Sequence, residues 1–195
     1  ALREAERTLQ EFAAWVDEQV EIHGVREGPL RSELTAGSPI LVLGERRRMD
    51  LAPLPGGRVR PRITLEGARL LCELPSDQLL DPRPAVERWL RRLARTEIPP
   101  RVDHWAAELD LHPSRVILGE RTSRWGSCSH RGTISYCYRL VMAPAEVVDA
   151  VVVHELCHLK HGNHGQRFYA LVRRHCPAHD ESMDWLRRHG GELDL

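Results

Sequence analysis

The spacing of apolar residues divides the front of the chain into a predicted helix and short strands. Apolar side chains recur at helical spacing over residues 2–22, which predicts an amphipathic helix that ends at Gly24. Residues 40–43 form a short apolar run and predict a strand. Residues 58–65 and 68–74 flank Glu66-Gly67, a pattern typical of a β-hairpin.

Helical spacing returns in the middle of the chain, where Asp81-Pro82 opens a predicted helix. Pro99-Pro100 is expected to break it, because proline removes a backbone donor, and a second helix is expected over residues 102–109. Residues 115–119 and 132–140 have the β-branched and aromatic content of strands. The stretch between these strands is polar and too rich in small residues for a helix.

The last third predicts three helices. Pro144 is expected at the first position of a helix that runs through His158, and its valines supply a buried stripe. Two shorter helices are expected over 166–175 and 179–189. The pattern as a whole predicts an α+β fold, in which a small β-sheet packs on the 144–158 helix. We divide the chain into a lead segment (1–57), a hairpin and helical region (58–112) and a core (113–195), and expect 58–195 to form one compact domain.

Composition excludes several classes of protein. Of the 195 residues, 42% are hydrophobic and 29% charged, which is ordinary for a globular protein. No apolar run is long enough to span a membrane, and the charged N-terminal stretch does not have the pattern of a signal peptide. The 28 basic and 28 acidic residues balance, so we expect no autonomous nucleic-acid binding. Five cysteines without a C-x-x-C pair predict reduced thiols in a cytoplasmic protein.

Histidines gather towards the end of the chain: seven of the 11 lie from His154 onward. His154-Glu155-Leu156-Cys157-His158 is an H-E-x-x-H motif on a predicted helix. Because residues four apart share a helix face, both imidazoles can reach one metal ion. Glu155 lies one step round the helix and suits a general base acting on a metal-bound water. The alternative is a surface helix with scattered histidines.

A catalytic zinc site needs a third protein ligand and an open position. His161 is seven residues from His154, about 10.5 Å along a helix, so the two cannot share one ion. We expect Gly162 to end the helix in a left-handed turn and His164 to return to the metal. The alternative third ligand is Glu181, from a following helix.

The sequence around this motif resembles a known family. The segments that carry the resemblance are R-W-G-S-C-S at 124–129, R-G-T-I-S at 131–135, R-L at 139–140, A-P at 143–144, V-V-V-H-E-L-C-H-L at 151–159, and Asn163-His164 with Phe168. They are similar to the YgjP-like metallopeptidase family, a relative of the SprT and WLM-type zinc proteases, most clearly over 115–190. The resemblance implies a zincin-like fold with zinc on His154, His158 and His164, and Glu155 as the catalytic acid/base.

Five residues are predicted to bind substrate: Arg124, Trp125, Ser127, Cys128 and His161. The polar loop before the 132–140 strand could line the cleft, where an edge strand pairs with an extended peptide. Arg124 could hold a carboxylate or a phosphate. The alternative is that Arg124 and Trp125 only hold the loop on the metal helix. A further alternative makes Cys128 a nucleophile.

We therefore expect a zinc metallopeptidase that cleaves peptides or proteins through a zinc-bound water, with Glu155 as general base. An additional oxyanion donor is expected from one of three residues: His161, Tyr136 or Tyr138. Partners that orient the ligating imidazoles are expected among Asp180, Glu181 and Asp184.

Two other functions stay open. One is a metal-dependent hydrolase of nucleotide phosphoanhydrides, because residues 46–131 carry a net charge of +6 and Arg124 suits a phosphate. The other is a DNA-associated protease of the SprT or WLM type, which the resemblance implies. The overall net charge of zero argues against binding to DNA without a further module. The oligomeric state does not follow from the sequence.

Overall fold

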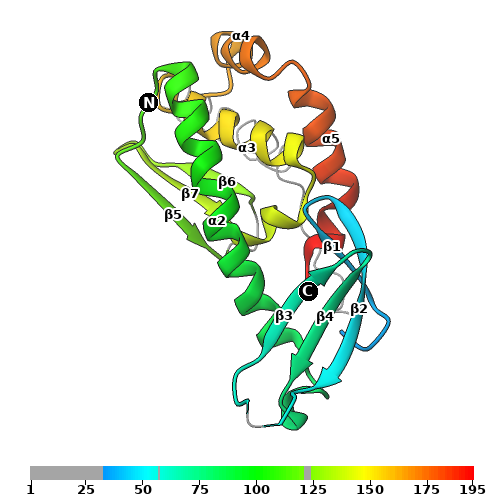
Figure 1. Ribbon diagram of the computed structural model, residues 1–195. Helices are drawn as coiled ribbons and strands as arrows, with labels where there is room; N and C mark the ends of the chain where they lie inside the picture. The colour runs from blue at the N-terminus through cyan, green and yellow to red at the C-terminus, as the bar shows by residue number, and fades with distance from the viewer. Residues whose placement is uncertain (1–32, 57, 121–123) are drawn as a thin grey trace, which may run out of the picture.

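The computed structural model describes residues 33–56, 58–120 and 124–195; the helix predicted over 2–22 lies outside them. Within these described residues, seven strands form two small sheets (Figure 1). The first has the order β1-β2-β4-β3 and the second the order β5-β7-β6. The strands are β1 (Pro39–Val42), β2 (Glu45–Pro53), β3 (Arg62–Glu66), β4 (Arg69–Leu74), β5 (Arg115–Gly119), β6 (Gly126–Cys128) and β7 (Thr133–Cys137).

The first sheet contains the predicted strand and hairpin together with one strand that the pattern did not indicate. β3 and β4 pair antiparallel, as predicted, and β1 pairs antiparallel with β2. β2 also pairs in parallel with β4, so it lies inside the sheet. Its sequence did not predict a strand because Met49 is its one fully buried residue and arginines occupy the preceding positions. Residues on both sides of position 57 therefore contribute strands to one sheet.

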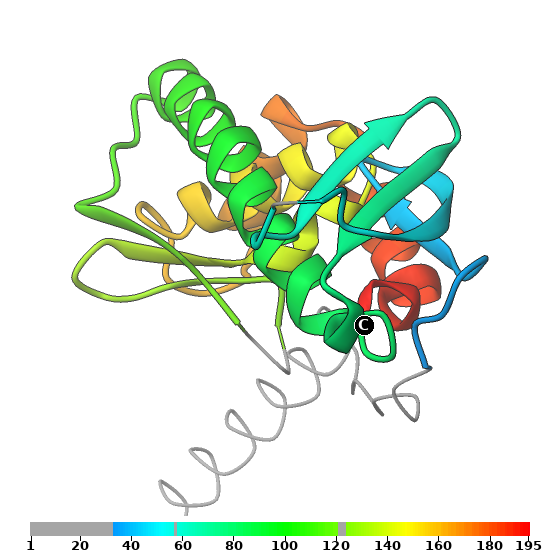
Figure 2. The same cartoon turned by 60° about the horizontal axis from the view of Figure 1, so that its bottom comes forward.

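A single long helix, α2 (Arg83–Leu109), replaces the two helices predicted in the middle of the chain. Pro99 and Pro100 lie inside it, so the predicted break is wrong. Its buried face continues across them, with Ala94, Ile98 and Val102 at a spacing of four. Packing against α3 and the η2 turn outweighs the backbone hydrogen bonds that the prolines remove. Figure 2 shows the two sheets on opposite sides of this helix.

The three helices predicted for the last third of the chain are confirmed. They are α3 (Ala145–Cys157), α4 (Gln166–His175) and α5 (His179–His189). Short 3₁₀ turns complete the fold: η1 (Ser76–Gln78), η2 (Tyr138–Met142) and η3 (Gly190–Leu193). The strand predicted over 132–140 ends at Cys137, because the chain turns there into η2, whose residues are all buried against α2. The predicted α+β fold, with a small sheet on the 144–158 helix and short helices after it, is confirmed.

A close approach between the first sheet and α3 positions the start of that helix. The turn between β1 and β2 donates backbone hydrogen bonds to η2, from Leu43 to Val141 and from Gly44 to Met142. Gly44 has a φ of +80°, and a Cβ at this position would lie 2.7 Å from the Cα of Pro144. Pro144 is the N-cap of α3, one position before the predicted one. Glycine is therefore required where the turn meets the helix.

Within the described residues, a large hydrophobic core extends through both sheets and the helices between them, and a second, small cluster joins α3 to α4. In the described part of the chain, no helix combines the length and apolar character of a membrane span. The five cysteines carry free thiols.

Candidate metal centre

The H-E-x-x-H segment lies in the most buried of the described helices. α3 contacts α2, α4, α5 and β6, and its side chains from Val151 to Cys157 are all buried. His154 is 3% exposed and Glu155 is 2% exposed. A surface helix with scattered histidines, the alternative in the sequence analysis, is therefore excluded.

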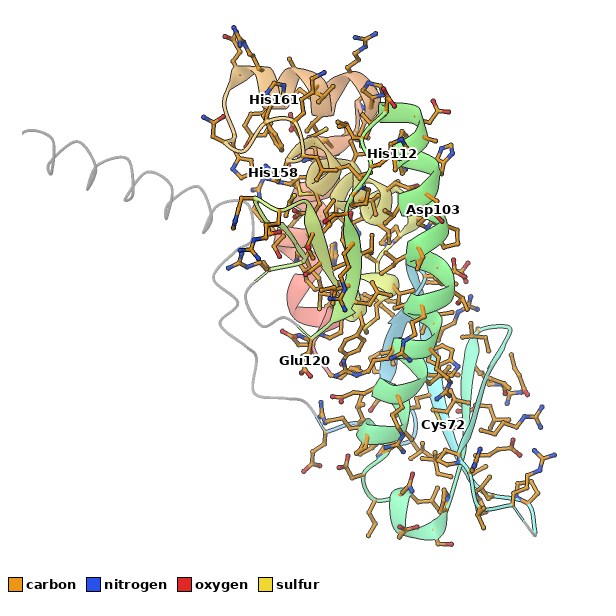
Figure 3. The ribbon with its side chains drawn as sticks, turned by 90° about the vertical axis from the view of Figure 1, so that its left-hand side faces the viewer. Cys72, Asp103, His112, Glu120, His158 and His161 are labelled. Carbon is orange, nitrogen blue, oxygen red and sulfur yellow. The ribbon has the colours of Figure 1, made fainter. Side chains whose placement is uncertain are left out.

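The chain reverses directly after α3 and brings His164 back to it. The helix ends at Cys157, and the backbone N–H groups of Lys160 and His161 donate to the carbonyl of Cys157. Gly162 does not adopt a positive φ, so the predicted left-handed turn at this glycine is wrong. The reversal is made by the turn at residues 158–160 instead. Figure 3 shows His158 and His161 at this end of the molecule, far from Cys72 in the first sheet.

Three imidazoles meet at this reversal. His154, His158 and His164 each offer one ligand atom, and these atoms lie within 4.8 Å of one another. The Nε2 atoms of His154 and His164 are 3.0 Å apart. Burial lowers the pKa of His158 and of His164 to about 4, and nearby histidines act in the same direction. Both rings are therefore neutral at pH 7 and have a lone pair for a metal ion.

The third histidine and the alternative carboxylate lie in different places. Glu181, on α5, is exposed and is not part of the cluster found in the described residues. His164 lies in the loop between α3 and α4, with its imidazole beside those of His154 and His158. The geometry thus favours His164 over Glu181 as a third ligand.

Each of the two helix histidines also has a partner for its other ring nitrogen. The Nδ1 of His158 lies 3.1 Å from the carbonyl oxygen of His161. The Nδ1 of His154 lies 3.1 Å from the Nε2 of His179, on α5. Such partners determine which ring nitrogen faces a metal. Of the three acids considered for this task, Asp180 reaches the site, through His179, whereas Asp184 pairs with Arg187.

The ring of Phe168 packs against all three imidazoles. Its ring is fully buried, with its centroid 4.9 Å from that of His154, 4.5 Å from that of His158 and 4.8 Å from that of His164. Its contact with the imidazoles does not follow from the spacing of the H-E-x-x-H motif. Phe168 and Val172, four residues apart, form the buried face of α4, and this spacing is the signal that could have indicated a buried contact.

Glu155 is a buried carboxyl group beside this cluster. Burial raises its pKa to about 8, and the positive charge of Arg124 acts in the opposite direction. Among the described residues, its Oε2 has no hydrogen-bond partner. An unsatisfied buried carboxyl oxygen is unfavourable in a folded protein, so this atom points to a function.

Gly126 makes room for this carboxyl group. A Cβ at residue 126 would lie 2.5 Å from Oε1 and 2.6 Å from Cγ of Glu155. The neighbouring Trp125 is 3% exposed and lies against Gly190. β6 is therefore pressed against α3 at the point where the general base is expected.

We expect Gly126→Ala to displace Glu155 and to destabilise the fold by about 1–3 kcal/mol, the usual effect of overpacking. Thermal unfolding and peptidase activity measure the two effects. Gly119→Ala is the matched control: Gly119 ends another strand of the same sheet, and a Cβ there would meet nothing within 4 Å. Equal unfolding temperatures and activities for the two variants would contradict the close contact.

The predicted substrate residues lie in different environments. Arg124 is exposed and close enough to Glu155 to affect its pKa, whereas Ser127, Cys128 and His161 are half-buried. Trp125 is in the core, packed with side chains of α3 and α5. This burial favours the alternative in which Trp125 holds the loop on the metal helix.

Three other candidates do not suit the chemistry considered for them. The hydroxyl of Tyr136 is buried and donates to the carbonyl of Val152, and burial raises its pKa. Tyr138 lies in η2 and is buried. The guanidinium carbon of Arg91 is 3.9 Å from the centroid of the Tyr138 ring. Neither phenol is available as an oxyanion donor. Burial, with the nearby Glu155, raises the pKa of Cys128 to about 11, which argues against a nucleophilic thiolate.

Comparison with known proteins adds a family to this geometry. A search of curated proteins gave no match. The chain is similar to the crystal structure of a metallopeptidase zymogen, jannalysin of Methanocaldococcus jannaschii, with 19% sequence identity and a TM-score of 0.42; the match covers 48% of this chain and 95% of that one. The family model of the YgjP-like metallopeptidase domain matches residues 1–189. Because this match spans most of the chain, the protein belongs to the YgjP-like metallopeptidase family and is a metal-dependent hydrolytic enzyme.

Proposed function

We propose that this metallopeptidase binds zinc through His154, His158 and His164 and uses Glu155 as its general base. The observation that carries the proposal is the cluster of three imidazole nitrogens within 4.8 Å beside a buried carboxyl oxygen that has no hydrogen-bond partner in the described residues. Three neutral nitrogen ligands with an open fourth position are the donor set of catalytic zinc. The residues present therefore fit the ion that the resemblance implies.

A bound zinc ion supplies a Lewis acid and lowers the pKa of a coordinated water towards neutrality. The carboxylate of Glu155 takes the proton of the attacking water on Oε2, which accepts no hydrogen bond from the described residues. The same carboxyl group then gives this proton to the amine nitrogen of the leaving group. His161, half-buried beside His158, is the remaining oxyanion donor of the three considered.

The edge of β6 is suited to an extended peptide. Ser129 donates to the carbonyl of Thr133, and Cys137 to that of Trp125, which sets the alternation of the β6–β7 ladder. In this register, the backbone N–H and C=O groups of Gly126 and Cys128 point away from β7. A substrate strand can pair with them next to Glu155. Arg124 can bind a carboxylate of that peptide.

The charges of the middle segment favour a peptide over a phosphate substrate. Arginines of this segment form ion pairs with acidic residues outside it: Arg46 with Glu192 and Arg101 with Asp149. The excess of basic residues is thus partly neutralised where they lie, which weakens the case for nucleotide or DNA substrates. The free thiols support the prediction of a reducing, cytoplasmic environment.

We expect the zinc-loaded protein to cleave unstructured peptides in a mixed library, and to leave nucleoside triphosphates intact. A chelator should abolish cleavage, and added zinc should restore it. The measurement is mass spectrometry of both pools with and without metal, after the metal content has been determined. Release of phosphate without peptide cleavage would instead assign a phosphoanhydride hydrolase, and a protein that binds no metal would contradict the proposal.

A further inference from the structure

His154 differs from His158 in the kind of group that its outward-facing nitrogen meets. The Nδ1 of His158 faces a backbone carbonyl, which no side-chain substitution removes. The Nδ1 of His154 faces the side chain of His179, at the first residue of α5. His179 is 3% exposed, and its backbone N–H donates to the carbonyl of Cys176. Its imidazole is therefore held in place behind His154.

The geometry of this contact is that of a directional hydrogen bond. The two ring planes differ by 8°, and the ring centroids are 5.4 Å apart. With Nδ1 and Nε2 separated by 3.1 Å, this centroid distance requires the rings to meet edge to edge in nearly one plane. The lone pair of one nitrogen then points along the N–H bond of the other, which is the favourable geometry.

We propose that His179 is a positioning residue of the metal centre, which accepts the Nδ1–H of His154 and thereby directs the Nε2 of His154 to the metal. The inference rests on the proposed function, because it takes Nε2 of His154 as a ligand. A ligand nitrogen carries no proton, so the proton of neutral His154 is on Nδ1. The Nε2 of His179 must then be the acceptor, and its own proton is on Nδ1.

The side chains that continue this series of hydrogen bonds beyond His179 are consistent with the assignment. The Nδ1 of His179 lies 3.1 Å from Oδ1 of Asp180, an acceptor that suits a protonated nitrogen. Oδ2 of Asp180 accepts from Nε of Arg173, on α4, at 3.1 Å. The side chains of Asp180 and Arg173 are 62% and 55% exposed, so water screens and can replace them. We therefore expect the effect to be concentrated in His179.

The test compares two substitutions with similar packing. His179→Phe keeps an aromatic ring beside His154 but has no acceptor, whereas His179→Gln places an amide oxygen where it can accept the Nδ1–H. We expect His179→Phe to weaken zinc binding about 10–100-fold, measured by competition with a chromophoric chelator. His179→Gln should bind zinc nearly as tightly as the wild type, and Asp180→Ala should have a smaller effect than His179→Phe. Cobalt-loaded His179→Phe should have an altered visible spectrum.

Stability without metal separates positioning from a structural role. The unfolding temperatures of wild type and His179→Phe in the presence of a chelator should agree. Equal zinc affinity in His179→Phe and wild type would overturn the inference, as would equal losses in the Phe and Gln variants together with lower metal-free stability. The proposed function fails separately, if the wild type binds no zinc or if His154→Ala binds it as tightly as the wild type.

Discussion

Glu155→Gln is expected to lower kcat for peptide hydrolysis by about 10²–10⁴-fold, the usual contribution of a general acid or base. Glutamine has nearly the same shape as glutamate but cannot take the proton of the attacking water. The zinc content should stay that of the wild type, because the three ligand nitrogens belong to His154, His158 and His164. The measurement pairs single-substrate kinetics with metal analysis of the two proteins.

The stability of metal-free Glu155→Gln distinguishes a loss of proton transfer from a loss of folded protein as the cause of the lower kcat. Burial raises the pKa of Glu155 from 4.5 to about 8, so the folded protein binds this proton more tightly than the unfolded chain does. The contribution of Glu155 to the free energy of unfolding therefore falls as the pH rises from about 4.5 to about 8. Glutamine does not ionise, so with a chelator present the variant should unfold at a higher temperature than the wild type at pH 8 and at the same temperature near pH 4.

An active Glu155→Gln enzyme would contradict the role of the general base. A variant that has lost both zinc and activity would show that Glu155 acts on the metal, and the assignment of its proton-transfer role would fail. Reduced kcat with intact zinc binding is the result that the geometry supports.

His164→Ala is expected to weaken zinc binding by more than about 100-fold, which is the upper end of the loss caused by removing an orienting partner. His164 contributes one of three ligand atoms, and its Nε2 lies 3.0 Å from that of His154. Loss of one of three ligands leaves two imidazoles from a single helix face. The peptidase activity should fall in parallel, because most of the variant protein then holds no zinc at the enzyme concentrations of an assay.

Glu181→Ala is the matched control for this prediction. Glu181 is exposed on α5, so its removal should change neither zinc affinity nor unfolding temperature. The opposite pattern, with tight zinc binding in His164→Ala and weak binding in Glu181→Ala, would assign the third ligand to the carboxylate. Isothermal titration of the metal-free proteins distinguishes the two results.

Some tertiary features were not visible in the local pattern. Pro99 and Pro100 predicted a break, yet α2 continues because its buried face packs on α3 and η2. The side chains of β2 do not show a strand pattern, yet the segment forms a strand because β1 and β4 pair with it on both sides. Gly162 was expected to reverse the chain, which instead turns directly after α3. In each case non-local contacts outweighed the local preference.

The sequence by itself determined the short-range features of this protein. Helical periodicity predicted α3, α4 and α5, and the four-residue spacing placed His154 and His158 on one face with Glu155 beside them. Such features depend on neighbours within a turn or two. Only the tertiary structure decided which distant groups meet these residues: His179 behind His154, Phe168 below the three rings, and Gly126 against Glu155. These contacts join α3 to α5, α4 and β6, and they follow from the packing of whole elements, which residue spacing along the chain does not record.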